Sequence, residues 1–140
     1  MRFPWHSDKK NPAEETARGT YSSDVVVESL TVPGVTITIG KMSFGRRVEL
    51  MRRVRELSRK TEFLAASEEA GEKMDAALLH AEIERLYVTW GVKAVSGLTV
   101  DGRVAGPELL AESGPEGLFR EALAAVRRET GLSEEERKNS

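Results

Sequence analysis

The segment that decides the fold runs from Ser43 to Ala66 and reads SFGRRVELMRRVRELSRKTEFLAA. Its hydrophobic residues recur at steps of three and four, with a gap near Thr61, and such steps return to one side of an α-helix. The sequence therefore predicts an amphipathic helix whose apolar stripe needs a covering surface. The expected stripe consists of Phe44, Val48, Met51, Val54, Leu57 and Leu64.

The other faces of this helix are strongly basic. Glu49 and Glu56 are its only carboxylates between residues 46 and 60, against the cations Arg46, Arg47, Arg52, Arg53, Arg55, Arg59 and Lys60. We favour a basic face that is solvated or paired with the acidic segments 68–75 and 134–136, and after that a protein-binding face. A nucleic-acid interface ranks last, because no aromatic residue is interleaved on this face for base stacking.

Composition restricts the classes of function. The 140 residues suit a single domain, and a net charge of -2 does not suit a general polyanion binder. With no Cys, the chain has no disulfide framework, no zinc–thiolate site and no thiol nucleophile, which fits a reducing compartment. No apolar run approaches the length of a membrane span, and the N-terminus lacks the apolar core of a secretory signal. We therefore expect no membrane partner.

Upstream of the helix the hydrophobic period changes to two. Residues 24–39 are rich in β-branched side chains, and Pro33-Gly34 lies between two such runs, which predicts a β-hairpin. Val35, Ile37 and Ile39 share one face of its second strand. That face must be covered by the helices, by further strands, or by strands of another copy or a partner.

The two ends of the chain have compositions unlike the middle. Residues 1–22 carry mixed charges without periodicity and predict a flexible arm. Phe3 and Trp5 are its exceptions, and they suggest either a loose arm or one that docks on a neighbouring subunit through Trp5. Residues 133–140 form a charged tail that we expect to fray.

A second helix is expected to follow the first. Gly71 marks either a break or a weak point, and we favour a helical hairpin with its second helix over residues 72–89 rather than one very long helix. Beyond it, Asp101-Gly102 predicts a tight turn, in a second small hairpin or an ordered loop.

Two further helices are expected toward the C-terminus. Pro107 opens a short helix over residues 108–111. The segment 113–116 matches a capping box, and the helix that follows should end at Gly131.

These elements predict an α+β fold that is mainly α. A single domain over residues 23–132 would combine a small N-terminal β-hairpin with a helical hairpin and C-terminal helices. The expected core is Val27, Ile37, Ile39, Met51, Val54, Leu57, Leu78, Leu86, Trp90, Phe119 and Leu123.

No stretch of the sequence encodes recognisable reaction chemistry. His80 and Glu84 are four residues apart on one helix face, but they lack a third ligand, and His6 lies in the arm. Nucleophile-elbow, metalloprotease and phosphate-loop patterns do not occur. We therefore assign no catalytic residue, no metal ligand and no cofactor.

A series of features is shared with a known family. They are Thr36-Ile37-Thr38-Ile39 closing the hairpin, the helix start at Ser43–Leu50, a helical hairpin that closes in Trp90, the turn at Val95–Gly102, and the tail Leu132–Ser140. In this order they resemble the small tail assembly chaperones of long-tailed bacteriophages, over about residues 24–140.

The resemblance implies a protein without catalytic residues, working in the cytoplasm of a bacterial host. Its implied partners are the tape measure protein and the tail tube protein, and it could form a homo-oligomer. The alternatives are a connector subunit of the phage tail and a nucleic-acid-binding regulator that uses the face from Arg46 to Lys60. The residues we expect to contact a partner are Val35, Ile37, Ile39, Phe44, Arg46, Arg47, Arg52, Arg53 and Trp5.

Overall fold

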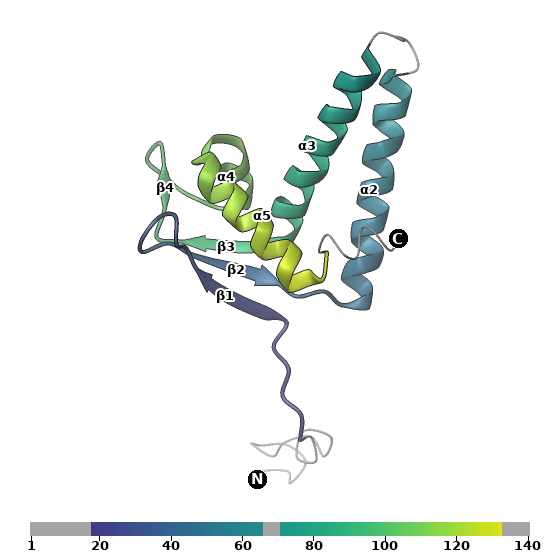
Figure 1. The fold of residues 1–140 in the computed structure, drawn as a ribbon. Coiled ribbons are helices and arrows are strands. Elements are labelled where there is room, and N and C mark those ends of the chain that lie inside the picture. Colours follow the sequence, from purple (N-terminus) through teal and green to yellow (C-terminus); the bar gives the residue numbers. More distant parts are fainter. Residues whose placement is uncertain (1–17, 66–70, 133–140) are drawn as a thin grey trace, which may run out of the picture.

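The fold is that of a computed structural model, which describes residues 18–65 and 71–132. It places a small sheet and two C-terminal helices in a body from which a helical hairpin projects (Figure 1). This arrangement agrees with the predicted α+β class. The predicted tail at 133–140 and the arm residues Phe3, Trp5 and His6 lie outside the described residues.

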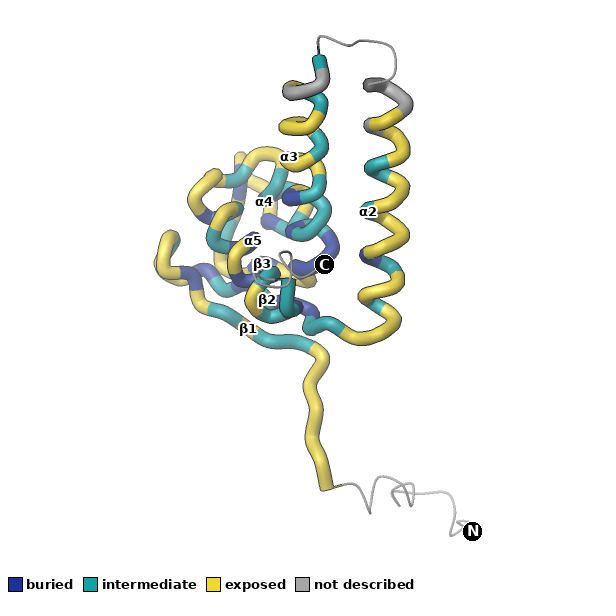
Figure 2. Tube along the Cα trace, turned by 45° about the vertical axis from the view of Figure 1, so that its right-hand side comes forward, coloured by how far each residue is buried: buried dark blue, intermediate teal, exposed yellow. Residues whose placement is uncertain are grey.

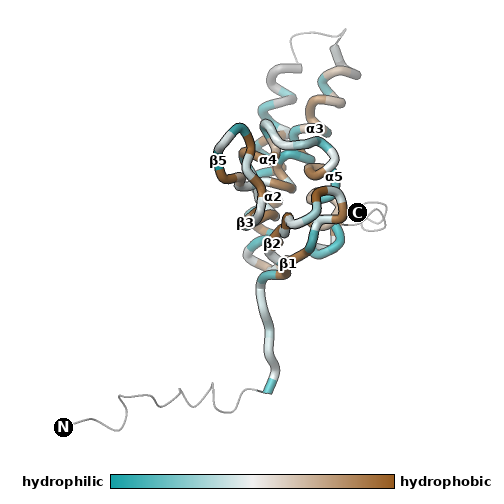
Figure 3. The backbone as a smooth tube through the Cα atoms, turned by 90° about the vertical axis from the view of Figure 1, so that its left-hand side faces the viewer, coloured by the Kyte–Doolittle hydropathy of each residue, from teal (hydrophilic) through white to brown (hydrophobic). Residues whose placement is uncertain are grey.

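The sheet has three antiparallel strands in the order β1-β2-β3. Strands β1 (Asp24–Glu28) and β2 (Thr36–Gly40) form the predicted hairpin, and β3 (Val92–Ser96) pairs with the other edge of β2. The chain itself therefore supplies the third strand, which the sequence analysis left open to another copy or a partner. The strands carry hydrophobic residues, brown in Figure 3.

The turn between β1 and β2 is the one that Pro33-Gly34 predicts. The Val35 N–H donates a hydrogen bond to the Val32 carbonyl at 3.2 Å, and Gly34 has φ +86°. A positive φ at the third position is the geometry of a type II turn, which glycine adopts without strain.

Helix α5 (Glu116–Thr130) forms the second layer, on one face of the sheet. Its buried Leu118, Ala122 and Val126 meet the inward-facing Ile37 and Ile39, which are both 0% exposed. Much of the core lies between this helix and the sheet, so of the covers that the sequence left open for this face of the hairpin, the structure has a helix of the same chain.

The predicted helical hairpin consists of α2 (Phe44–Ala65) and α3 (Glu72–Gly91). The Arg46 N–H donates to Ser43 Oγ at 3.2 Å, so Ser43 is the predicted N-cap. Helix α3 continues directly into β3, whereas α2 packs chiefly on α3. Much of α2 is therefore exposed, as its yellow colouring in Figure 2 shows.

The remaining elements join β3 to α5. Strands β4 (Thr99–Val100) and β5 (Arg103–Val104) flank the turn at Asp101-Gly102, so the predicted second hairpin is present. Helix α4 (Pro107–Ser113) then packs against α3 and α5.

The ends of α5 match the prediction only in part. Gly131 has φ +77° and ends the helix as predicted. The predicted capping box is wrong, because Pro115 occupies the N-cap position and no side chain caps the helix there.

The predicted core is confirmed at Ile37, Ile39, Trp90 and Leu123, which are all buried. Partly buried residues packed against it include Val27, Val54, Leu86 and Phe119, and Leu57 is also half-buried. The prediction is wrong at Met51 and Leu78, which are 64% and 55% exposed. Both lie on the helical hairpin, where α2 and α3 cover only the sides that face one another.

Trp90 joins the start of α2 to the body. The Arg46 guanidinium lies 4.2 Å from the centroid of the Trp90 ring, and its Nη2 donates to the Trp90 carbonyl at 3.2 Å. A Cβ at Gly40 would lie 3.0 Å from Arg46 Nη2, so the glycine leaves room for this side chain. The contact sets the position of α2 relative to the sheet.

Candidate protein-binding surface

Helix α2 has two apolar stripes where the sequence predicted one. Leu50, Val54 and Leu57 lie on the inner side of α2, which packs chiefly on α3, and they are buried or half-buried. At about 100° per residue, Val48 and Met51 belong to a second stripe, about a third of a turn away. The steps of three and four therefore combined residues from both stripes.

The second stripe is open to solvent. We call Phe44, Val48 and Met51 the outer face of α2, and these side chains are 84%, 37% and 64% exposed. Single exposed apolar residues are ordinary, but three that share one side of a helix make that side a candidate interaction surface. Of the three, the sequence analysis had named only Phe44 as a partner contact and had assigned Met51 to the core.

A groove of about 690 Å³ lies beside the outer face. Tyr87 of α3, Met42 before α2 and Leu132 after α5 contribute to its walls. The α2 residues that line it are Arg47, Val48, Leu50, Met51, Arg52, Val54 and Arg55. Met42, Tyr87 and Leu132 come from three separate segments, so no periodicity in the sequence could have placed them together.

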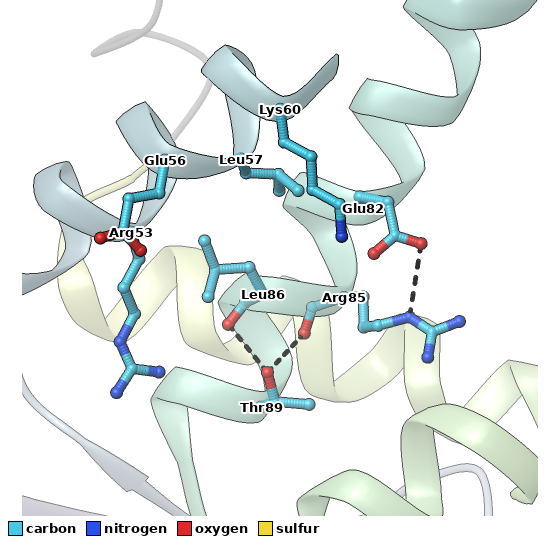
Figure 4. A pocket seen from close by; sticks show the side chains of 8 residues that line it. All are labelled: Arg53, Glu56, Leu57, Lys60, Glu82, Arg85, Leu86 and Thr89. Carbon is cyan, nitrogen blue, oxygen red and sulfur yellow. Dashed lines mark hydrogen bonds and ion pairs between the residues drawn. The ribbon is translucent and has the colours of Figure 1, made fainter. Parts of the chain in front are cut away.

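A second groove, of about 470 Å³, lies between α2 and α3 and has a different character. In Figure 4, Leu57 and Leu86 point into the space between the helices, and charged side chains surround them. Arg85 Nε lies 3.8 Å from Glu82 Oε1. This groove contains charges of both signs, so it lacks the one-sided charge of the groove beside the outer face.

The arginines predicted to contact a partner have different environments. Arg46 is half-buried, and its guanidinium is held on Trp90 within the chain. Arg53 Nη2 donates to Glu49 Oε1 at 2.7 Å. Arg47 and Arg52 are exposed and line the groove beside the outer face.

The sheet residues predicted to contact a partner are core residues of this chain. Val35, Ile37 and Ile39 are 1%, 0% and 0% exposed. Their alternation along the strand was predicted correctly, but α5 covers the face they form. These side chains are therefore not part of the candidate surface.

Among the side chains that the structure describes, Glu84 carries the most buried charge, and it belongs to an ion-pair cluster between α3 and α5. Both carboxylate oxygens of Glu84 accept hydrogen bonds from Arg120 Nη1, at 2.9 and 3.0 Å, and these bonds raise the pKa of Arg120. His80 Nε2 lies 3.6 Å from Glu84 Oε2, so the predicted pair shares a face. Since Glu84 belongs to α3 and Arg120 to α5, this ion pair joins the two helices.

No cluster with the composition of a metal site occurs within residues 18–65 and 71–132. In the same ranges, no helix has the length and apolarity that crossing a bilayer requires.

A second carboxylate, Glu121 of α5, fixes the loop between β1 and β2. It accepts hydrogen bonds from Ser29 Oγ at 2.5 Å and from the Leu30 N–H at 2.7 Å. Burial raises the pKa of Glu121, but hydrogen bonds from Ser29, Leu30 and Thr31 outweigh burial and lower it overall. The Leu30 side chain is 94% exposed on this fixed loop.

Comparison with known proteins identifies no similar protein. No family model matches the chain, and neither a curated protein nor a solved structure matches it. The resemblance to phage tail assembly chaperones thus stays a prediction from the sequence motifs.

Proposed function

We propose that this chain is a non-catalytic phage tail assembly chaperone that holds a helical segment of the tape measure protein on the outer face of α2. The observation that carries the proposal is the exposure of Phe44, Val48 and Met51 beside an apolar groove. A helix-in-groove contact needs such a surface, with apolar anchors at helical spacing. The resemblance supplies the identity of the partner.

The shape of the molecule supports this function. The outer face of α2 is exposed, whereas the core is formed by α5, the sheet and the inner sides of α2 and α3, from which the far end of the hairpin projects (Figures 1 and 2). The outer face can therefore be covered and uncovered without disturbing the fold. A chaperone that releases its client during assembly requires this independence, and the bacterial host cytoplasm is where tails assemble.

Co-expression with a tape measure fragment tests the proposal. The wild-type chain should raise the soluble fraction of the fragment and co-purify with it. A Phe44→Ser, Val48→Ser, Met51→Ser triple variant should do neither. Val104→Ser is the matched control, because Val104 is 82% exposed but lies on β5, away from α2. Equal activity of the triple variant and the wild type would refute the assignment of this surface.

The connector alternative makes a different prediction. A chaperone leaves the particle before the tail is finished, whereas a connector subunit stays in it. Mass spectrometry of purified virions should therefore find the tape measure and tube proteins without this chain. Recovery of the chain in amounts comparable with a tail subunit would favour the connector.

A further inference from the structure

Charge in the groove beside the outer face has only one sign. Its lining consists of apolar side chains, Tyr87, and the guanidinium groups of Arg47, Arg52 and Arg55. Among the side chains that the structure describes, no carboxylate forms an ion pair with any of these three arginines. The groove thus combines an apolar floor with unpaired positive charge.

Unpaired charge of one sign selects the partner. Symmetric pairing of two copies through this groove is disfavoured, because it would bring the arginines of one copy close to those of the other. A basic or neutral helix would be stabilised only by contact with the apolar floor of the groove. An acidic amphipathic helix would gain from both the floor and the arginines.

From this complementarity we infer that the groove takes an amphipathic helix carrying carboxylates along the edge of its apolar stripe. The inference rests on the proposed function and names the chemistry of the partner segment. Arg47 and Arg55 are eight residues apart, which is about 12 Å along the helix axis. A helix lying along α2 can meet both arginines with two carboxylates seven or eight residues apart.

The probe is a pair of synthetic helical peptides of equal length. Both carry Leu at positions i, i+3, i+4 and i+7, and they differ only at two flanking positions seven residues apart, which hold Glu in one peptide and Lys in the other. Binding to the full chain is measured by calorimetry at low and high salt. The Glu peptide should bind on the order of tenfold more tightly at low salt, because each exposed ion pair contributes modestly. The preference should shrink at high salt.

Substitutions assign the preference to named residues. Arg47→Ser with Arg55→Ser should remove the preference for Glu and leave the Lys peptide unaffected or better bound. The matched control is Arg103→Ser, an exposed cation on β5. Equal binding of the two peptides, or a preference that survives in the double variant, would overturn the inference. If the chain still raises tape measure solubility in that case, the proposed function stands and the charge selection fails alone.

Two other occupants would also overturn the inference. Leu132 lines the groove, and Glu134–Glu136 follow it in the sequence. If the Glu peptide binds only after these three glutamates are replaced by serine in the full chain, the groove belongs to the chain's own tail. If the free chain forms a dimer that Met51→Ser dissociates, it belongs to a second copy. A monomer whose peptide binding is independent of these glutamates supports an external acidic helix.

Discussion

Helices α2 and α5 are both amphipathic, and the structure uses them differently. α5 buries most of its apolar stripe against the sheet and α3, with Leu118 at 0% and Leu123 at 2% exposure. α2 is longer, yet Leu50 is its one fully buried residue among those whose side chains are described. An amphipathic pattern therefore predicts a helix with an apolar face, but it does not predict whether the chain itself covers that face.

The largest expected difference between the two helices concerns side-chain truncation. Leu118→Ala in α5 should lower the free energy of unfolding by about 2–5 kcal/mol, because it opens a cavity in a closed core. Met51→Ala in α2 should change it by less than about 0.5 kcal/mol, since the side chain is already largely solvated. Urea denaturation of both variants measures the difference. Comparable losses would mean that the outer face is part of the core.

The next effect separates two arginines of α2. Arg46→Ala should cost about 2 kcal/mol of unfolding free energy, because it removes the stacking on Trp90 and the hydrogen bond to the Trp90 carbonyl. Arg52→Ala should be neutral within about 0.5 kcal/mol. Thermal unfolding of both variants compares their stability, and equal midpoints would contradict a structural role for Arg46.

Two glycines give effects of opposite sign. In Gly91→Ala the new methyl would lie 2.6 Å from Val126 Cγ1, so the contact between α3 and α5 must shift and stability should fall by about 1 kcal/mol. In Gly45→Ala nothing lies within 4 Å of the new methyl, and the helix should gain up to about 1 kcal/mol. Chemical denaturation of both variants measures the change in the free energy of unfolding. A loss of stability in Gly45→Ala would indicate that the start of α2 is already covered.

The smallest effect depends on pH. Because the folded state lowers the pKa of Glu121, its ionised form stabilises the fold above the usual pKa of a glutamate, and this contribution is lost as the pH falls. The stability difference between wild type and Glu121→Gln should be largest near neutral pH and shrink below about pH 4. Urea denaturation of both proteins at several pH values, from neutral to below about pH 4, measures this stability difference. A difference independent of pH would show that the Ser29 and Leu30 hydrogen bonds do not require the charge.

Much of the fold could be predicted from the sequence because local signals determine it. The Pro33-Gly34 turn, the N-cap at Ser43 and the left-handed Gly131 each act within a few residues, and each was placed correctly. The third strand, β3, was not predicted. Its pairing with β2 joins segments more than fifty residues apart, and no local pattern specifies such a register.

The candidate surface was less accessible from sequence. Val35, Ile37 and Ile39 were predicted as partner contacts because they form a sticky face, but α5 covers it. Met51 was predicted as core for the same kind of reason, and it is exposed. In both cases periodicity found the apolar face, and only the tertiary packing decided whether the chain covers it.

The central claim is that the outer face of α2 is a binding surface and takes no part in the core. Amide hydrogen exchange of the full chain, with and without a bound tape measure fragment, tests it most directly. The account predicts slower exchange along residues 44–55 in the complex and unchanged exchange in β1. Protection confined to the strands, with residues 44–55 exchanging as fast as in the free chain, would contradict it.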